Sequence, residues 1–347
     1  MKPGLRAAVV ATAAAVALAF TGSALAAYTP HLTISHTPLA LGGGGTTDVT
    51  VTFDQSDDAT AKATIYVPQG YTGTLGVAAG TQLGTIDASI IAFQISPTQP
   101  LPLKGTIQAD DPAKYVANPC SPGMHEAVWL LRLQAAGTEL AVPGYVDTTA
   151  GAEAALGKFK LQFCLPSPYI PASAGGATLG AKLVSATLHL SNVFSLPSDN
   201  GSFPWILVAT PYTVGSGVPN AAGTTQAQGI VRLPAQLSLK AKVKKKTATL
   251  SGALKLNAAG LAGTAVSLLS GSSRTKLKAA GSTTTRAGGA YSFRKTVRKP
   301  TYFRTRVTVP ARSTSCTGGV PGIPCASATL NPFSVQSAIV RVKPKKP

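Results

Sequence analysis

Residues 291–309 read YSFRKTVRKPTYFRTRVTV, and they alternate between apolar and basic or polar side chains on both sides of Pro300. Tyr291, Phe293 and Val297 fall on one face of an extended chain, and Phe303, Val307 and Val309 do the same further on. A period of two is typical of a β-strand that has one face in the core and the other in water. The stretch therefore predicts two half-buried strands with solvated basic faces.

The same pattern extends over the whole C-terminal part. Residues 237–243 place Leu237, Leu239, Ala241 and Val243 on one face, with lysines on the other. Seven strands are expected in all, over residues 237–243, 247–254, 264–270, 275–279, 291–297, 302–309 and 335–342. Seven short strands in about 110 residues match the size of an immunoglobulin-like sandwich, although strand propensity does not separate it from other Greek-key sandwiches.

The charge of the chain is divided unevenly. Residues 236–347 contain 21 Lys and Arg and no acid, and Asp199 is the last acidic residue. Residues 27–235 contain eight basic and twelve acidic side chains, a net charge of −4. Surfaces selected only for solubility normally mix both signs, so the basic part is predicted to attract anions. Because the basic faces would lie on both outer sheets, the field is expected to be diffuse.

Two further segments carry a resemblance to a known group of modules. Residues 263–268 read GTAVSL and residues 285–293 read TRAGGAYSF. They resemble the Ig-like repeats of bacterial surface proteins, including carboxypeptidase-regulatory-like and prealbumin-like modules, over about 60 residues from Gly252 to Val309. Such modules usually act as spacers, stalks or adhesive units. Arg286 stands where the turn commonly carries Asp, so the resemblance implies no calcium site here.

The N-terminal part also predicts strands rather than helices. Short alternating runs are separated by turns rich in Gly, Pro, Asn and Asp, which favours a sandwich or a barrel. Ten strands are expected, near residues 31–35, 48–53, 63–67, 105–108, 127–133, 140–146, 159–163, 183–190, 205–209 and 229–233. Charge and strand spacing both change at Pro234-Ala235. The expected organisation is all-β, with a large sandwich over 27–235 and a smaller basic Ig-like sandwich over 236–347.

The first 26 residues have the pattern of a secretory signal peptide. Lys2 and Arg6 precede an apolar run, and Ala24-Leu25-Ala26 fits a cleavage site, so Ala27 is the expected mature start. Export to an oxidising compartment favours disulfides. Four cysteines allow three connectivities, and one pair in each part, Cys120–Cys164 and Cys316–Cys325, is the simplest. The CxxC spacing of a zinc site is missing from the sequence.

Catalytic motifs are weak. His125-Glu126 begins like a zinc-protease helix but lacks the second histidine, and the pairs Asp57-Asp58 and Asp110-Asp111 fit turns. Trp129 and Trp205 are predicted to be core residues rather than sugar platforms. Glu126, Glu139 and Asp147 would form an acid–base site only if the tertiary fold brought them together. No catalytic residue, metal or cofactor is assigned.

The expected function is that of a secreted, non-enzymatic surface protein, retained at the cell envelope by charge. Its partners would be anionic envelope polymers or acidic polysaccharide, with nucleic acid less favoured because few aromatic side chains accompany the charges. The alternatives are a secreted carbohydrate-active or other hydrolytic enzyme with a basic targeting module, and an extracellular polyanion or DNA binder. The predicted anion-binding residues are Lys240, Lys242, Lys244, Lys245, Lys246, Arg294, Arg298, Arg304, Arg306, Arg341 and Lys343.

Overall fold

A computed structural model of the protein describes residues 28–135, 138–177, 180–233, 236–256 and 259–344. Within these residues the regular structure is almost entirely β-strand, and the helical segments are single 3₁₀ turns of three to five residues. The all-β prediction is therefore confirmed. In this part of the chain no helix has the length and apolar character needed to cross a bilayer. The predicted signal peptide, residues 1–26, lies outside the described residues.

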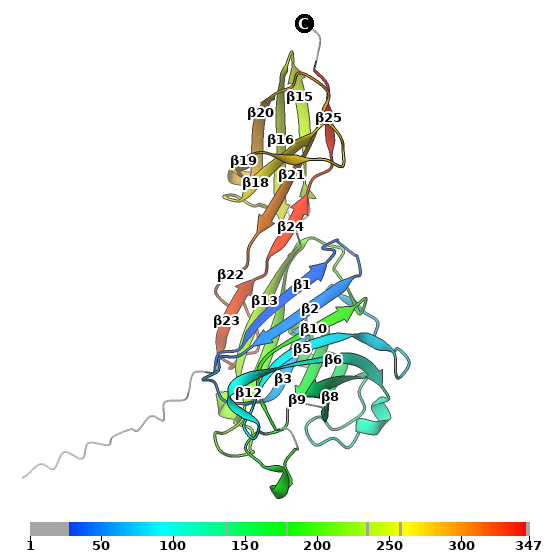
Figure 1. The fold of residues 1–347 in the computed structure, drawn as a ribbon, viewed down its shortest axis with the longest axis vertical. Helices are drawn as coiled ribbons and strands as arrows, with labels where there is room; N and C mark the ends of the chain where they lie inside the picture. Colours follow the sequence, from blue (N-terminus) through cyan, green and yellow to red (C-terminus); the bar gives the residue numbers. More distant parts are fainter. Residues whose placement is uncertain (1–27, 136–137, 178–179, 234–235, 257–258, 345–347) are drawn as a thin grey trace, which may run out of the picture.

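Most strands of the N-terminal part belong to one antiparallel sheet, in the order β1-β2-β10-β5-β6-β7-β8-β9-β3-β12-β13 (Figure 1). They are β1 (His31–Thr37), β2 (Thr46–Thr52), β3 (Thr60–Val67), β5 (Gln82–Ala92), β6 (Ser96–Asp110), β7 (Ala127–Ala135), β8 (Thr138–Thr148), β9 (Phe159–Cys164), β10 (Lys182–Ser191), β12 (Gly201–Pro211) and β13 (Thr225–Leu233). Two short strands, β4 (Thr72–Gly73) and β11 (Phe194–Ser195), pair apart from this sheet.

All ten predicted N-terminal strands are present, but β5 was not expected. Its Gly84 and Asp87 belong to residue types that are depleted in strands. The strand nevertheless forms because β10 pairs with one of its edges and β6 with the other. Pairing with distant strands thus overrides the weak local preference of this segment.

The large sheet is so strongly curved that its first strand, β1, lies against its eleventh, β13. Strand β1 lies against β12 and β13, and the backbones come so close that a Cβ on Gly229 would sit 3.0 Å from the carbonyl oxygen of Leu32. Any larger side chain at position 229 would push the two strands apart. The fold is sandwich-like, but both layers belong to one continuous sheet.

A large apolar core lies inside the roll. Trp129 and Trp205 are 1% and 0% exposed, and both belong to this core, as predicted. Trp205 meets the ring of Tyr71 edge-on at 5.3 Å between centroids. The disulfide Cys120–Cys164, with its Cα atoms 6.3 Å apart, ties the segment before β7 to the end of β9. The prediction for this pair is therefore confirmed.

The C-terminal module consists of two facing five-stranded sheets (Figure 1). The first sheet contains β14 (Gln236–Leu237), β15 (Lys240–Lys244), β16 (Thr247–Leu256), β17 (Ala259–Gly260) and β20 (Ala290–Thr296). The second contains β18 (Ala265–Gly271), β19 (Lys278–Thr284), β21 (Thr301–Val309), β24 (Phe333–Gln336) and β25 (Val340–Val342). The predicted first and seventh strands are each split in two, and the fourth begins three residues later than expected.

The predicted side-chain phase of this module is confirmed. Phe293 is 8% exposed and Val307 is 0% exposed, and both belong to the module's own core. Arg294 and Arg306, on the opposite faces of the same strands, are exposed. The first and fifth predicted strands share one sheet and the sixth and seventh share the other, as expected.

The chain does not stay in this module from residue 236 to its end. After β21 it returns to the N-terminal sheet, where β23 (Cys325–Leu330) pairs in parallel with β13 and β22 (Arg312–Ser313) pairs with β23. It then enters the C-terminal module again as β24. The single boundary predicted at residue 235 therefore differs from the structure. The free edge of β13 explains why: it offers hydrogen-bonding groups that β23 satisfies.

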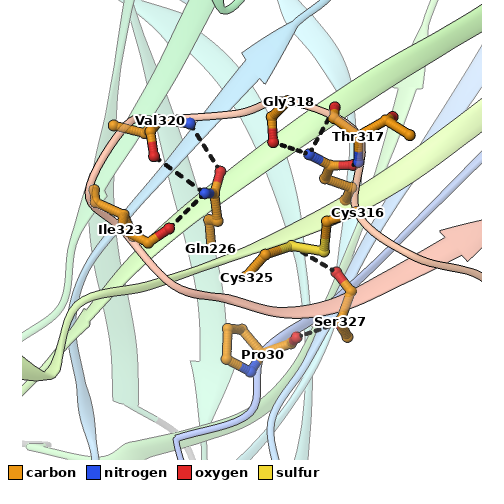
Figure 2. The surroundings of a disulfide bond; sticks show 10 residues. Pro30, Gln226, Cys316, Thr317, Gly318, Val320, Ile323, Cys325 and Ser327 are labelled. Atoms are coloured by element: carbon orange, nitrogen blue, oxygen red, sulfur yellow. Dashed lines mark hydrogen bonds between the residues drawn. A yellow bond between two sulfur atoms is a disulfide. The ribbon is translucent and has the colours of Figure 1, made fainter.

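The loop between β22 and β23 bonds two buried glutamines of β13, Gln226 and Gln228, and Figure 2 shows Gln226 with its partners in this loop. Gln226 is 3% exposed, and its Nε2 donates to the carbonyl oxygens of Val320 and Ile323 at 3.2 and 2.7 Å. The N–H of Val320 donates back to Gln226 Oε1 at 3.0 Å. The disulfide Cys316–Cys325 closes the loop, as predicted. A segment predicted to be part of the basic module is thus anchored on the N-terminal sheet.

Candidate functional site

Basic side chains gather at the end of the C-terminal module that is remote from the N-terminal sheet. The β15–β16 turn carries Lys245 and Lys246, and the N–H of Val297 donates to the carbonyl oxygen of Lys246 at 2.7 Å. This bond places the β15–β16 turn beside the segment between β20 and β21, which carries Arg298 and Lys299. Figure 1 shows this end of the module pointing away from the large sheet.

Strand β25 brings further charge to the same end. Tyr302 pairs with Arg341, and Thr301 pairs with Val342, so Lys343 lies just beyond the start of β21. Gly271, the last residue of β18, pairs with Tyr302 from the other side, and this brings the β18–β19 turn with Arg274 to the same place. We call this group the distal basic end; it consists of Lys244, Lys245, Lys246, Arg274, Lys276, Arg298, Lys299, Arg341 and Lys343.

Two arginines flank an aromatic ring within the distal basic end. The guanidinium carbon of Arg341 lies 5.6 Å from the centroid of Tyr302, and that of Arg274 lies 6.0 Å from it. Both distances are within the range of a cation–π interaction. Arg274 was not among the predicted residues, because only the pairing of β18 with β21 shows that it lies beside Tyr302. The clustering of basic turns at one end also differs from the predicted diffuse field.

The remaining predicted residues lie on the two outer faces of the module. Lys242 pairs with Thr249, and Thr249 pairs with Arg294, so these three side chains form a row across the first sheet. Strand spacing places Lys242 and Arg294 about 10 Å apart. Lys240, two residues before Lys242 on β15, is exposed on the same face. Arg306 lies on the opposite outer face, on β21, so one flat anionic surface does not reach all of the predicted residues.

Arg304 differs from the prediction of a fully solvated side chain. It is half-buried, and its Nη1 donates to Oε1 of Gln336 at 2.7 Å. The neighbouring strand β24 supplies this partner. Arg304 therefore contributes to the contact between β21 and β24 as well as to the charge of the outer face.

The carboxylates and histidines of the N-terminal part form separate small groups. His125 Nδ1 bonds Asp147 at 3.0 Å and its Nε2 bonds the carbonyl oxygen of Ser121, so both ring nitrogens are occupied. Glu126 accepts hydrogen bonds from Thr148. Glu139 is paired with Arg132 on the hairpin formed by β7 and β8. Asp147 also accepts a hydrogen bond from the N–H of Glu126 at 3.2 Å, so these two acids lie together, whereas Glu139 lies at the other end of β8. The three acids suggested for an acid–base site therefore do not meet in one place.

One histidine joins two carboxylates on the outside of the large sheet. His189 Nδ1 lies 2.8 Å from Asp48, and its Nε2 lies 3.2 Å from Asp87. Burial lowers the pKa of His189, but the hydrogen bonds to both carboxylates outweigh this effect, and the net pKa is raised. Within the described ranges, no group of three or more His, Cys, Asp and Glu side chains is arranged to hold a metal ion.

The comparisons with known proteins leave the family open. No family model matches the chain, and no curated protein matches it. Among solved structures, a β-1,2-glucanase from Parabacteroides distasonis is 11% identical with a TM-score of 0.17. The alignment covers 92% of this chain but only 37% of the glucanase chain. At this TM-score the likeness supports no argument about fold or activity.

Proposed function

We propose that this protein is an exported, non-enzymatic envelope protein whose C-terminal module binds anionic polymers through the distal basic end. The observation that carries the proposal is the arrangement of charge: four separate segments place nine Lys and Arg at one end, and residues 236–347 contain no acid. Uncompensated positive charge raises the local concentration of anions. The position of this end, away from the rolled sheet, leaves it accessible to a large polymer.

The chemistry of the site favours a ligand of high charge density over one of defined sequence. Lysines on turns are flexible point charges, whereas Arg274 and Arg341 present planar donors beside Tyr302. Binding by exposed charges is screened at physiological salt, where the Debye length is about 8 Å. The proposed affinity is therefore modest and strongly dependent on salt. Wall polymers and acidic polysaccharide are the anions that an exported protein meets first.

The experiment measures retention of the mature chain on an anionic envelope polymer, a heparin-like resin and DNA over a salt series. The variant Lys246→Glu/Arg298→Glu reverses two charges of the distal basic end. The control, Lys255→Glu/Arg286→Glu, makes the same charge change at exposed positions near β17, at the other end of the module. We expect the distal variant to elute at a clearly lower salt concentration than the control.

The whole chain is used because residues 312–330 belong to the N-terminal sheet, so the fragment 236–347 is not a structural unit. If both variants elute at the same lowered salt concentration, only the net charge of the module matters, and the distal basic end is not a specific binding site. Flow-through of the unmodified chain at low salt would overturn the proposal. Preference for DNA over equally charged polysaccharide would favour the nucleic-acid alternative.

Export is the second part of the proposal. Its support is the leader pattern in residues 1–26 together with two disulfides. N-terminal sequencing of the protein from the culture medium should show a chain that begins at Ala27. Recovery of the protein only from the cytoplasm, with Met1 and reduced cysteines, would contradict this part of the proposal.

A further inference from the structure

A cleft separates the two modules on the side where β1 ends. Its volume is about 350 Å³, and the residues around it come from both parts of the chain. The N-terminal part contributes Ser35, His36, Leu39 and Arg232, and the C-terminal module contributes Thr308, Phe333 and Ser334. Leu39 packs against the cores of both modules. This size lies within the usual range of pockets for small molecules.

Arg232 is the charged group of this cleft, and it is almost completely buried. Arg232 is 5% exposed, although it lies on the outer face of β13, because Asn331 and Phe333, the first residue of β24, lie against it. One nitrogen, Nη2, donates to the carbonyl oxygen of Asn331 at 2.8 Å. The guanidinium stacks on Phe333, with its carbon 4.9 Å from the ring centroid. These contacts hold the group in place but leave its charge unmatched.

Among the residues that the structure describes, no carboxylate pairs with Arg232. Every ion pair among the described residues lies before residue 190, and no acid follows Asp199 in the sequence. Burial lowers the pKa of Arg232, and the positive charge of Arg312 lowers it further. Burying a charge without a counter-charge is costly, because the protein interior does not replace the lost hydration.

Further polar atoms at and next to this guanidinium also lack partners among the described residues. The Nε of Arg232 has no acceptor, and neither side-chain atom of Asn331 has a partner among the described residues, although Asn331 is 1% exposed. Burial lowers the pKa of His36 to about 4, so at neutral pH His36 adds no positive charge. Asp48, which accepts a hydrogen bond from Ser35, is already bonded to His189. The wall of the cleft thus carries one cation without a carboxylate partner among the described residues, and the unsatisfied side chain of Asn331 belongs to a residue that bonds this cation.

We propose that this cleft binds the carboxylate or phosphate group of a small organic molecule through Arg232. A planar guanidinium suits both groups, because each accepts hydrogen bonds from two nitrogens at once. The hydroxyls of Thr308 and Ser334, which lie 3.3 Å from each other, are placed to bond the same ligand. The apolar side chains of Leu39 and Phe333 would contact its carbon skeleton.

This site is separate from the distal basic end and does not depend on the proposed function. The ligand would touch residues of both modules, so its binding would oppose their separation. A buried ion pair is screened by salt much less than an exposed one. Binding in the cleft should therefore survive salt concentrations that release anionic polymers from the distal basic end.

The test titrates the mature protein with inorganic phosphate, acetate and glucuronate at high salt, by calorimetry and by thermal unfolding. We expect saturable binding of one molecule per chain and a rise in Tm for at least one probe. The variant Arg232→Met keeps the length and apolar contact of the side chain but removes its charge, and it should bind at least tenfold more weakly. The control, Arg306→Met, removes an exposed charge and should bind as the unmodified protein does.

The comparison of phosphate with the two carboxylates identifies the group that the cleft prefers. If Arg232→Met does not fold, the conservative variant Arg232→Lys replaces it; this variant keeps the charge without the planar fork and should bind more weakly than the unmodified protein. Absence of saturable binding of all three probes to the unmodified protein would overturn the proposal. Equal binding by the Arg232 and Arg306 variants would overturn it as well. Retention on heparin-like resin should be the same for both variants, so this result and that of the polymer experiment are independent.

Discussion

Gln228 and Thr317, 89 residues apart in the sequence, bond each other reciprocally. The N–H of Thr317 donates to Gln228 Oε1 at 2.9 Å, and Gln228 Nε2 donates to the carbonyl oxygen of Thr317 at 3.3 Å and to that of Gly318 at 3.0 Å. Gln228 is 0% exposed. One side-chain amide therefore replaces water for three backbone groups of the loop, and it fixes this loop on β13.

Replacing Gln228 should loosen the contact between the loop and the sheet. Gln228→Ala would leave the N–H of Thr317 and two carbonyl oxygens without partners, and an unsatisfied buried group costs about 1–3 kcal/mol. We expect the free energy of unfolding to fall by that amount in denaturant titrations. Gln99→Ala, at an exposed position of β6, is the control and should change it by less than about 0.5 kcal/mol. If Gln228→Ala and Gln99→Ala change the free energy of unfolding equally, the hydrogen bonds of Gln228 to the loop contribute nothing to stability.

Removing the second disulfide should act on the same loop. Cys316 and Cys325 are nine residues apart, and the chain-entropy model gives about 2–3 kcal/mol for a loop of this size. In the double variant Cys316→Ser/Cys325→Ser we expect faster amide hydrogen exchange over residues 314–331, while residues 290–296 keep their protection. Unchanged exchange in the loop would mean that Gln226 and Gln228 hold it without the disulfide.

The side-chain phase of β20 and β21 can be tested by two substitutions that each truncate a large side chain to alanine. Phe293→Ala removes a buried aromatic ring and should cost about 3–5 kcal/mol. Arg306→Ala removes an exposed side chain and should stay within about 0.5 kcal/mol. Thermal or denaturant unfolding of the mature chain measures both. Similar costs at the two positions would contradict the observed alternation.

His189 should make stability depend on pH. Its pKa is raised in the folded protein by the hydrogen bonds to Asp48 and Asp87, which outweigh the effect of burial. A raised pKa means that the folded state binds the proton more tightly than the unfolded state. The stabilisation is therefore fully present below the pKa of an unfolded histidine, and it is lost as the pH rises through the higher folded value.

The variant His189→Gln removes this proton but can still bond one of the two carboxylates. We expect the difference in Tm between the unmodified protein and the variant to be largest near pH 5.5 and to shrink toward pH 8. His31→Gln, at an exposed position on β1, is the matched control. A difference in Tm that does not vary with pH would show that the ion pairs at His189 add no pH-dependent stability.

Much of the C-terminal module could be predicted from the sequence because its signals are local. Alternation between Phe293 and Arg294, or between Val307 and Arg306, follows from the two-residue repeat of a strand. The cysteine pairs could be predicted from their number and their division between the two parts. The charges of Lys246, Arg298 and Arg341 could be read directly, but their gathering at one end depends on which turns meet.

Pairings between distant segments could not be predicted from the sequence. In the sequence of β13, TQAQGIVRL, the two-residue repeat of a strand puts Gln226, Gln228 and Arg232 on one face. The structure buries this face because residues 312–333 return to cover it, a pairing over about 90 residues that no local pattern encodes. Which side chains share a face follows from the local sequence alone. Whether that face meets water or protein depends on a long-range contact, and so does the unpaired charge of Arg232.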